Sequence, residues 1–260
     1  IVFFSLYSAS TAVNEIEYQV STYDKLQLDG LMTEPDKISG KLPGVLMIHG
    51  AGPMDKNLWF PSFLSGNGKA HGAFSDIAQK LAQKNIISFR YDKRGIKGTG
   101  QSPIIDHSIY DNITFKQLVS DAADALKVLQ SNPNVDPNKI IILGISQGTL
   151  IAPYVATKVK TVSGLVLMAS IGKTEKYDNT VVIADLELPT LLLHGESDTV
   201  TPLDQALLIK GALEKKGSPF TLITYPGLGH GFAKTDSKIK LGPVETNTIK
   251  EIPQWINKNF

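Results

Sequence analysis

The chain contains no cysteine, no long apolar run and no strong excess of either charge. Without cysteine, disulfides, thiolate nucleophiles and cysteine metal sites are excluded, so a serine has to carry any nucleophilic chemistry. No stretch approaches the roughly 20 apolar residues needed to span a bilayer. The formal net charge is +1 at pH 7, and lysine and arginine are scattered, which gives no reason to expect nucleic acid or an anionic surface as a partner.

The chain is 260 residues long, with 42% hydrophobic and 20% charged residues. These proportions are ordinary for a folded globular protein and give no sign of disorder. The length is at the upper end for a single domain, and α/β folds of this size are commonly one unit with one core. We therefore predict one domain over residues 15–260, preceded by a short N-terminal segment over residues 1–14.

The N-terminal segment begins on Ile1 without an initiator methionine. Residues 1–12 form an apolar run followed by small residues, which resembles the end of a signal peptide and would imply export. The alternative is an ordered strand or helix in a fragment that has lost its start. The predicted location is therefore either cytoplasmic or secreted, including periplasmic.

Short apolar runs typical of strands alternate with segments of helical spacing along most of the chain. Residues 15–22 and 25–33 predict an antiparallel hairpin near the start. Further strands are predicted at residues 45–48, 86–89, 140–143, 162–168, 189–193 and 220–225, and helices at residues 74–84, 118–129, 148–159, 203–216 and 244–258, the last interrupted by Pro253. This order predicts an α/β fold with a mostly parallel sheet, helices on both faces and functional groups at the carboxyl ends of the strands.

A Gly-x-Ser-x-Gly turn, Gly144-Ile-Ser146-Gln-Gly148, separates an apolar strand from a segment of helical spacing. The pentapeptide alone is common, but this setting predicts a nucleophile elbow. The two glycines permit the tight turn and leave no side chain to block an incoming carbonyl group. Ser146 is therefore the predicted nucleophile.

A serine at neutral pH requires a base within hydrogen-bond reach, and the base requires a group that orients it. His230 lies in a glycine-rich loop after the strand at 220–225, and Asp198 lies directly after the strand at 189–193. Both therefore follow carboxyl ends of strands. We predict a Ser146-His230-Asp198 triad, with Glu196 as the fallback acid if Asp198 faces away.

An oxyanion hole is also required, because negative charge develops on the carbonyl oxygen in the transition state. The backbone N–H of Gln147, directly after the nucleophile, is one predicted donor, and that of Ala51, in a small-residue loop after the strand at 45–48, is the other. We predict that His49 has a structural role, with its ring hydrogen-bonded to nearby loop backbone. His194, which also precedes a glycine, is predicted to be structural as well.

Five segments resemble the motif series of the α/β-hydrolase superfamily, and the resemblance covers the chain from Leu42 to its C-terminus. They are His49-Gly-Ala-Gly-Pro53, Arg90-Tyr-Asp-Lys-Arg94-Gly95, Gly144-Ile-Ser-Gln-Gly148, His194-Gly-Glu-Ser-Asp198 and Gly229-His230-Gly231. The chain is most similar to the branch of prolyl-oligopeptidase, serine-aminopeptidase and dienelactone-hydrolase-like esterases. In that branch the Arg-Tyr-Asp-x-Arg-Gly segment is a structural turn, so the resemblance implies an internal ion pair between Asp92 and Arg94.

Relatives in this superfamily often carry a long helical cap before the strand that bears the acid, but here only residues 169–188 fill that interval. The cap is therefore expected to be absent or tiny, and the site open. Trp59, Phe60 and Phe63 lie in a loop rich in aromatics and glycine. They are expected either to line an acyl or aryl pocket or to pack beneath the loop.

The leading interpretation is a serine carboxylesterase that hydrolyses small esters, with short acyl or aryl groups, through an acyl-enzyme. A small-molecule ester is the expected partner, and no metal, cofactor or nucleic acid is implied, whereas the oligomeric state is open. A serine peptidase on the same triad is the alternative, because fold and triad do not choose the leaving group. An inactive binding protein is disfavoured by the complete triad, and haloalkane or epoxide chemistry by serine at the elbow.

Overall fold

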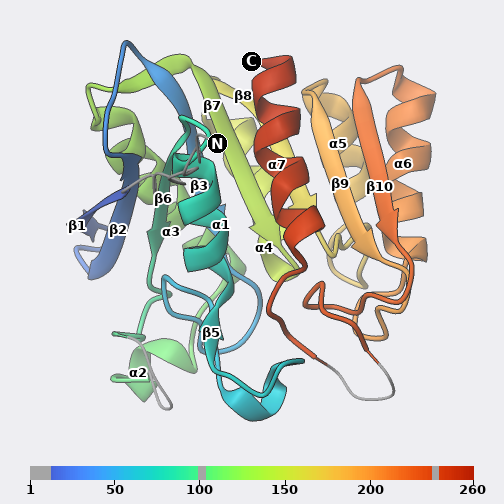
Figure 1. Ribbon diagram of the computed structural model, residues 1–260, viewed down its shortest axis with the longest axis horizontal. Coiled ribbons are helices and arrows are strands. Elements are labelled where there is room, and N and C mark those ends of the chain that lie inside the picture. The colour runs from blue at the N-terminus through green and yellow to red at the C-terminus, as the bar shows by residue number, and fades with distance from the viewer. Residues whose placement is uncertain (1–12, 99–103, 236–239) are drawn as a thin grey trace, which may run out of the picture.

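The structure is a computed structural model that describes residues 13–98, 104–235 and 240–260 (Figure 1). The apolar run over residues 1–12, which resembles the end of a signal peptide, lies outside these ranges. Within them, no helix has the length and apolar character needed to cross a bilayer.

An eight-stranded sheet crosses the middle of the molecule in the order β1-β2-β6-β3-β7-β8-β9-β10 (Figure 1). Its strands are β1 (Val13–Ser21), β2 (Gln27–Pro35), β3 (Leu42–Ile48), β6 (Ile87–Tyr91), β7 (Val135–Ile145), β8 (Val162–Met168), β9 (Thr190–Gly195) and β10 (Phe220–Tyr225). From β6 to β10 every neighbouring pair is parallel, and β2 pairs antiparallel with both β1 and β6. The mostly parallel sheet and the N-terminal hairpin are confirmed.

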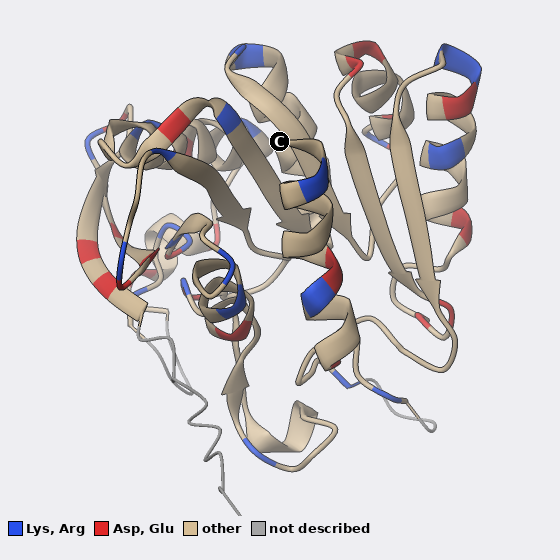
Figure 2. Cartoon of the chain, turned by 45° about the horizontal axis from the view of Figure 1, so that its top comes forward, with Lys and Arg blue, Asp and Glu red and all other residues tan. Residues whose placement is uncertain are grey.

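Helices cover both faces of this sheet. They are α1 (Ala73–Ala82), α3 (Phe115–Ser131), α4 (Gln147–Lys158), α5 (Asn179–Leu186), α6 (Asp204–Lys216) and α7 (Thr246–Asn259), whereas the single-turn helix α2 (His107–Tyr110) buries no residue and lies away from the sheet. A two-stranded ribbon of β4 (Trp59–Phe60) and β5 (His71–Gly72) lies below α1 in Figure 1, with the short 3₁₀ helix η1 (Ser62–Leu64) between its strands. Basic and acidic residues are interspersed on the helices seen in Figure 2.

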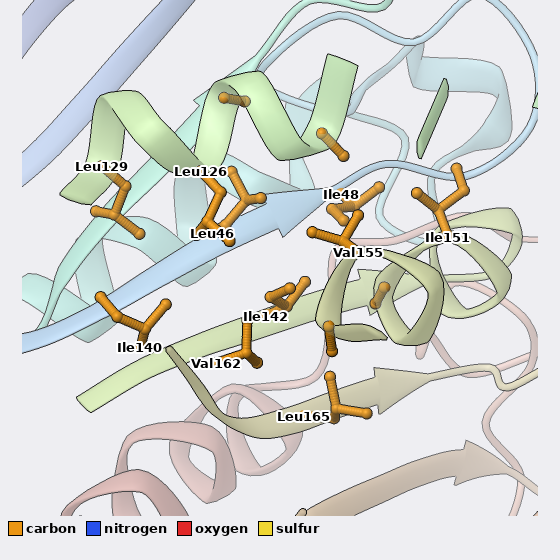
Figure 3. Close-up of a cluster of buried hydrophobic side chains, with 14 of the residues drawn as sticks. Leu46, Ile48, Leu126, Leu129, Ile140, Ile142, Ile151, Val155, Val162 and Leu165 are labelled. Atoms are coloured by element: carbon orange, nitrogen blue, oxygen red, sulfur yellow. The ribbon is translucent and has the colours of Figure 1, made fainter. Parts of the chain in front are cut away.

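Two apolar clusters, one on each face, hold the layers together. Leu46 of β3 and Ile142 of β7 point toward α3 and α4 and contact their buried apolar side chains (Figure 3). The alternate residues Val45 and Leu143 point to the other face and belong to the cluster with α1 and α7. Because both faces are covered, the central strands are continuous apolar runs, and their side chains are fully buried.

Three local predictions differ from the structure. Strand β7 begins at Val135, five residues earlier than predicted, because Val135 pairs with Leu42, whereas the next pair in the ladder is Gly44 with Ile140 and residues 136–139 form an irregularity between the two. Helix α7 continues through Pro253, which is buried against the core, instead of being interrupted there. The third difference is helix α5, which the spacing of apolar residues in the sequence does not predict.

Helix α5 occupies the interval in which relatives carry a cap. It is eight residues long, begins after Asp178, whose carboxylate accepts from Thr180 N, and buries Ile183 and Ala184. This helix packs against α4 and α6 and not over the carboxyl ends of the strands. A large cap is therefore absent between β8 and β9, as expected.

Candidate active site

Ser146 lies in the one-residue turn between β7 and α4, with φ 52° and ψ −117°. Positive φ is uncommon for a serine, and the packing around the turn enforces it. A Cβ atom at Gly144 would lie 2.4 Å from Gly148 O, and one at Gly148 would lie 2.1 Å from Ile48 O. Both glycines are therefore required, and the chain has the geometry of a nucleophile elbow at this position.

The three residues of the predicted triad lie within hydrogen-bond distance of one another in series. His230 Nε2 is 3.1 Å from Ser146 Oγ, and His230 Nδ1 is 2.8 Å from Asp198 Oδ2. Glu196, the fallback acid, instead accepts a hydrogen bond from Thr224 Oγ1 at 2.7 Å. The structure thus connects Ser146, His230 and Asp198, and leaves Glu196 outside the series.

Asp198 is held by the turn that follows β9. Its Oδ1 accepts from the backbone N–H groups of Val200 and Thr201, both at 2.8 Å, so Oδ2 is left to face the imidazole. His194 stabilises this turn, because its Nε2 contacts Thr201 O at 2.8 Å while Nδ1 accepts from Ser170 N at 3.3 Å. Burial lowers the pKa of His194, which favours the neutral ring that these contacts require. His194 is therefore structural, as predicted.

Ala51 and Gln147, the predicted oxyanion donors, lie on either side of Ser146. Gln147 is the first residue of α4, where backbone N–H groups have no acceptor within the helix and the helix dipole favours negative charge. Ala51 lines the same cavity as Ser146, and a Cβ at the adjacent Gly50 would lie 3.3 Å from Ser146 Cβ. The loop after β3 therefore approaches the serine closely.

An apolar cavity of about 270 Å³ opens at Ser146 and His230. Of the three aromatic candidates, Phe60 lines it and is 8% exposed. Trp59 is not among the lining residues, because neighbouring side chains of a strand point to opposite faces, and Phe63, in η1, is 76% exposed. Of the three aromatic residues, Phe60 thus lies at the cavity, and Trp59 and Phe63 do not line it.

Aliphatic side chains form most of the remaining wall. They come from two segments distant in sequence, the loop after β3 and the loop before α7, and are Met54, Leu58, Leu241 and Val244. No sequence pattern had marked them, since they meet only through the tertiary fold.

Asp92 and Arg94 do not pair with each other, contrary to the implication of the superfamily resemblance. Asp92 accepts from Lys56 N at 2.6 Å and Lys56 Nζ at 3.3 Å, whereas Arg94 binds Asp121 at 2.6 Å and Asp24 at 3.0 Å. Each therefore ties the turn after β6 to a different part of the fold.

The prediction for His49 is wrong in its detail. Both ring nitrogens are buried and have no hydrogen-bond partner among the described residues, while the ring packs against Tyr91 at 5.2 Å between centroids. Burial first, and the charge of Lys93 second, hold the pKa of His49 well below its usual range. His49 is therefore a neutral packing residue and not a hydrogen-bonding support of the loop.

Lys93 is the polar residue that the sequence did not single out. It lies at the variable position of the Arg-Tyr-Asp-x-Arg-Gly segment and is 4% exposed. Its Nζ donates to Gly50 O at 2.7 Å and to Gly52 O at 2.9 Å, on both sides of Ala51. Burial lowers the pKa of Lys93 to about 7. The signal by which the sequence could have identified Lys93 is its position directly after a strand that leads to the site.

Comparison with known proteins identifies the family of this chain. The model of the dienelactone hydrolase family matches residues 67–254, which is most of the chain. The chain belongs to the dienelactone hydrolase family. The match includes Ser146, Asp198 and His230, and ends before the last residues of α7. The family is named for a hydrolase, which agrees with the geometry at Ser146.

The chain is also similar to two curated proteins and shares its fold with a solved structure. Esterase EstD of Thermotoga maritima is 25% identical over 292 aligned positions, which cover 89% of this chain and 66% of EstD. The uncharacterized peptidase YuxL of Bacillus subtilis is 24% identical over 251 positions, covering 84% of this chain and 36% of YuxL. The α/β hydrolase GrgF of Penicillium sp. sh18 has the same fold, with a TM-score of 0.67 at 16% identity over 95% of this chain and 99% of that one.

The chain of this dienelactone hydrolase family member spans only part of these two curated relatives. It spans about two thirds of EstD and about a third of YuxL. Within the part of the chain that the structure describes, no group of three or more histidine, aspartate and glutamate residues is arranged to hold a metal ion.

Proposed function

We propose that this protein is a serine carboxylesterase that hydrolyses small esters with short acyl or aryl groups. The observation that carries the proposal is the hydrogen-bonded series from Ser146 Oγ through His230 to Asp198, at 3.1 Å and 2.8 Å. The esterase among the relatives, EstD, agrees with the proposal at the level of reaction class.

In the proposed reaction, Ser146 Oγ attacks the ester carbonyl while His230 Nε2 takes its proton. Asp198 stabilises the imidazolium and keeps the ring in the required tautomer. The backbone N–H groups of Ala51 and Gln147 stabilise the oxyanion of the tetrahedral intermediate. His230 then returns the proton to the departing alcohol, and a water molecule, activated by the same imidazole, releases the acid from Ser146.

The cavity supports a small acyl group. Its volume of about 270 Å³ lies just below the range of roughly 300–1,000 Å³ typical of ligand pockets. Its wall is apolar apart from Ser146 and His230, so a hydrocarbon chain or aromatic ring can enter without leaving a polar wall group unpaired.

The test is hydrolysis of p-nitrophenyl acetate and butyrate by the wild type and Ser146→Ala, with labelling by a fluorophosphonate probe. We expect Ser146→Ala to lower kcat by at least about 10⁴-fold and to abolish labelling. Ser131→Ala, at the exposed end of α3, is the matched control and should keep wild-type values. A folded wild type that neither hydrolyses nor labels would overturn the proposal.

A peptidase on the same three residues is the second candidate, and the relative YuxL favours it. An aminopeptidase needs a carboxylate to hold the free amino group of its substrate. None of the described residues that line the cavity is aspartate or glutamate. Turnover of aminoacyl p-nitroanilides faster than of p-nitrophenyl esters of the same acid would favour the peptidase.

A further inference from the structure

Lys93 is a buried cation whose partners are all uncharged. Its Nζ donates to the carbonyl oxygens of Gly50 and Gly52 and lies 3.4 Å from Gln147 Oε1, and no ion pair of Lys93 is found within the described ranges. Burying an ammonium without a carboxylate is costly, and an apolar side chain of similar length would fill the same space. Because burying the Lys93 ammonium is costly, its role has to lie in these three contacts.

The contact with Gly50 O determines the direction of Ala51 N–H. These two groups belong to one planar trans peptide unit, in which C=O and N–H point opposite ways. Lys93 Nζ holds the carbonyl at 2.7 Å on one side, so the N–H is directed to the other side.

The two sides of this peptide face different cavities. Ala51 lines the apolar cavity with Ser146, whereas Lys93 lines a separate cavity together with Gly52 and Gln147. The loop after β3 therefore stands between the ammonium and the serine, with its carbonyl groups toward the cation. A backbone bond from Lys93 N to Met54 O at 3.2 Å holds the lysine and the loop together.

The ammonium also reaches the second proposed donor. Gln147 supplies a backbone N–H to the proposed oxyanion hole, and its side-chain oxygen lies 3.4 Å from Lys93 Nζ. One side chain thus contacts the Gly50–Ala51 peptide unit, through Gly50 O, and the side chain of Gln147. Because the site is buried, the positive charge polarises the intervening peptide more strongly than it would in water.

We propose that Lys93 is the positioning residue of the oxyanion hole: it orients the Gly50–Ala51 peptide and the first residue of α4 so that their N–H groups face the oxygen bound at Ser146. This inference rests on the proposed serine hydrolase chemistry. Lys93 touches no reacting atom, and its effect passes entirely through Ala51 and Gln147.

The decisive variant is Lys93→Met, which keeps the length of the side chain and removes the donor and the charge. We expect kcat to fall about 10- to 100-fold with KM within about twofold, because one misplaced oxyanion donor costs on the order of 10²–10³ in kcat. A trifluoromethyl ketone that forms an oxyanion adduct with Ser146 should lose affinity by the same factor as kcat. If part of the variant merely failed to fold, the concentration of active sites would fall, and the kcat of each folded molecule would stay at the wild-type value.

Lys97→Met is the matched control, since Lys97 lies in the same segment, is 62% exposed and pairs only at 3.7 Å with Asp29. It should keep the wild-type kcat and labelling rate. If Lys93→Met does not fold, Lys93→Leu, which also lacks the donor and the charge, takes its place with the same expected pattern. Wild-type kcat and ketone affinity in the folded variant, or a rise in KM alone, would overturn the role of Lys93.

The rate of fluorophosphonate labelling separates this proposal from the esterase proposal. A wild type that labels but hydrolyses no ester would remove the esterase function, and a tenfold slower labelling of Lys93→Met would still support the positioning role. A wild type that hydrolyses esters while Lys93→Met labels and turns over normally would overturn the positioning role alone. A folded wild type that does neither would overturn both.

Discussion

At the scale of single residues, the site separates the groups that we propose to react from the groups that hold them. Asp198 divides its two oxygens between the imidazole and two backbone N–H groups, and His194 fixes the turn beneath it. Lys93 has the corresponding place under the loop that carries Ala51. Its contribution has a cost in stability, because burial lowers its pKa from 10.5 to about 7.

That cost predicts a pH-dependent stability difference between the wild type and Lys93→Met. Below about pH 7, Lys93 is charged in both the folded and unfolded chains, so the full cost of burying the charge is present. Between about pH 7 and 10, the unfolded chain binds the proton and the folded chain does not, so the wild type gains stability as pH rises. We expect a gain of up to about 1.4 kcal/mol per pH unit relative to Lys93→Met.

Urea unfolding of both proteins at pH 6, 8 and 9.5 measures this difference. Lys97→Met, from an exposed position, should show no pH trend relative to the wild type. A constant difference between wild type and Lys93→Met over this range would show that Lys93 keeps its proton in the folded state.

At the scale of elements, the sequence is most informative where a side-chain period persists over several turns or residues. A capping box at Thr114 and Gln117 opens α3, and the central strands are the predicted apolar runs. Helix α5 is too short to show a period, and the start of β7 depends on its pairing with Leu42 across a register shift. Such features follow from contacts between distant segments and not from local pattern.

The same distinction between local pattern and distant contacts explains which site residues the sequence predicts and which it does not. Ser146, Asp198 and His230 each follow a predicted strand closely, so parallel topology alone places them at one edge of the sheet. Lys93 follows β6 in the same way, but a lysine after a strand is common and carries no motif. The wall of the cavity comes from loops, whose conformation the side-chain period does not predict.

The β4–β5 ribbon gives an element-scale prediction, because it directs Phe60 into the cavity while Phe63, in η1, is exposed. Phe60→Ala enlarges the acyl cavity, so the ratio of kcat/KM for p-nitrophenyl octanoate over acetate should rise about tenfold or more, in line with the roughly 10–200-fold range for fitting one methylene. Phe63→Ala is the control and should leave the ratio within twofold. Equal ratios in Phe60→Ala and the wild type would mean that the acyl group lies elsewhere.

At the scale of the whole molecule, a buried ion cluster joins three separate parts of the fold. Arg94, after β6, binds both oxygens of Asp121 in α3 and also Asp24 in the β1–β2 turn. The hydrogen bond from Arg94 is the main reason that the pKa of Asp24 falls to about 2. The N-terminal hairpin is thereby connected to the helical layer as well as to the sheet edge.

Arg94→Met should therefore destabilise the protein strongly, since it leaves Asp121 buried without its partner. We expect a loss of about 3–5 kcal/mol in the free energy of unfolding at pH 7, measured in urea. Lys210→Met, which breaks a surface pair with Glu214 on α6, is the control and should cost less than about 1 kcal/mol. A loss for Arg94→Met as small as that of the control would show that Asp121 takes up a proton or water instead.

The cavity and the Ser146-His230-Asp198 series belong to different parts of the chain. Met54, Leu58 and Phe60 precede α1, and Leu241 and Val244 precede α7, whereas the reacting groups follow β7, β9 and β10. The side chains that bound the acyl end of the cavity therefore come from two loops, whereas the groups proposed to react follow the carboxyl ends of strands. If residues 54–72 are exchanged between two family members, the acyl preference of the first protein should pass to the second, and proton transfer in the second should stay unchanged.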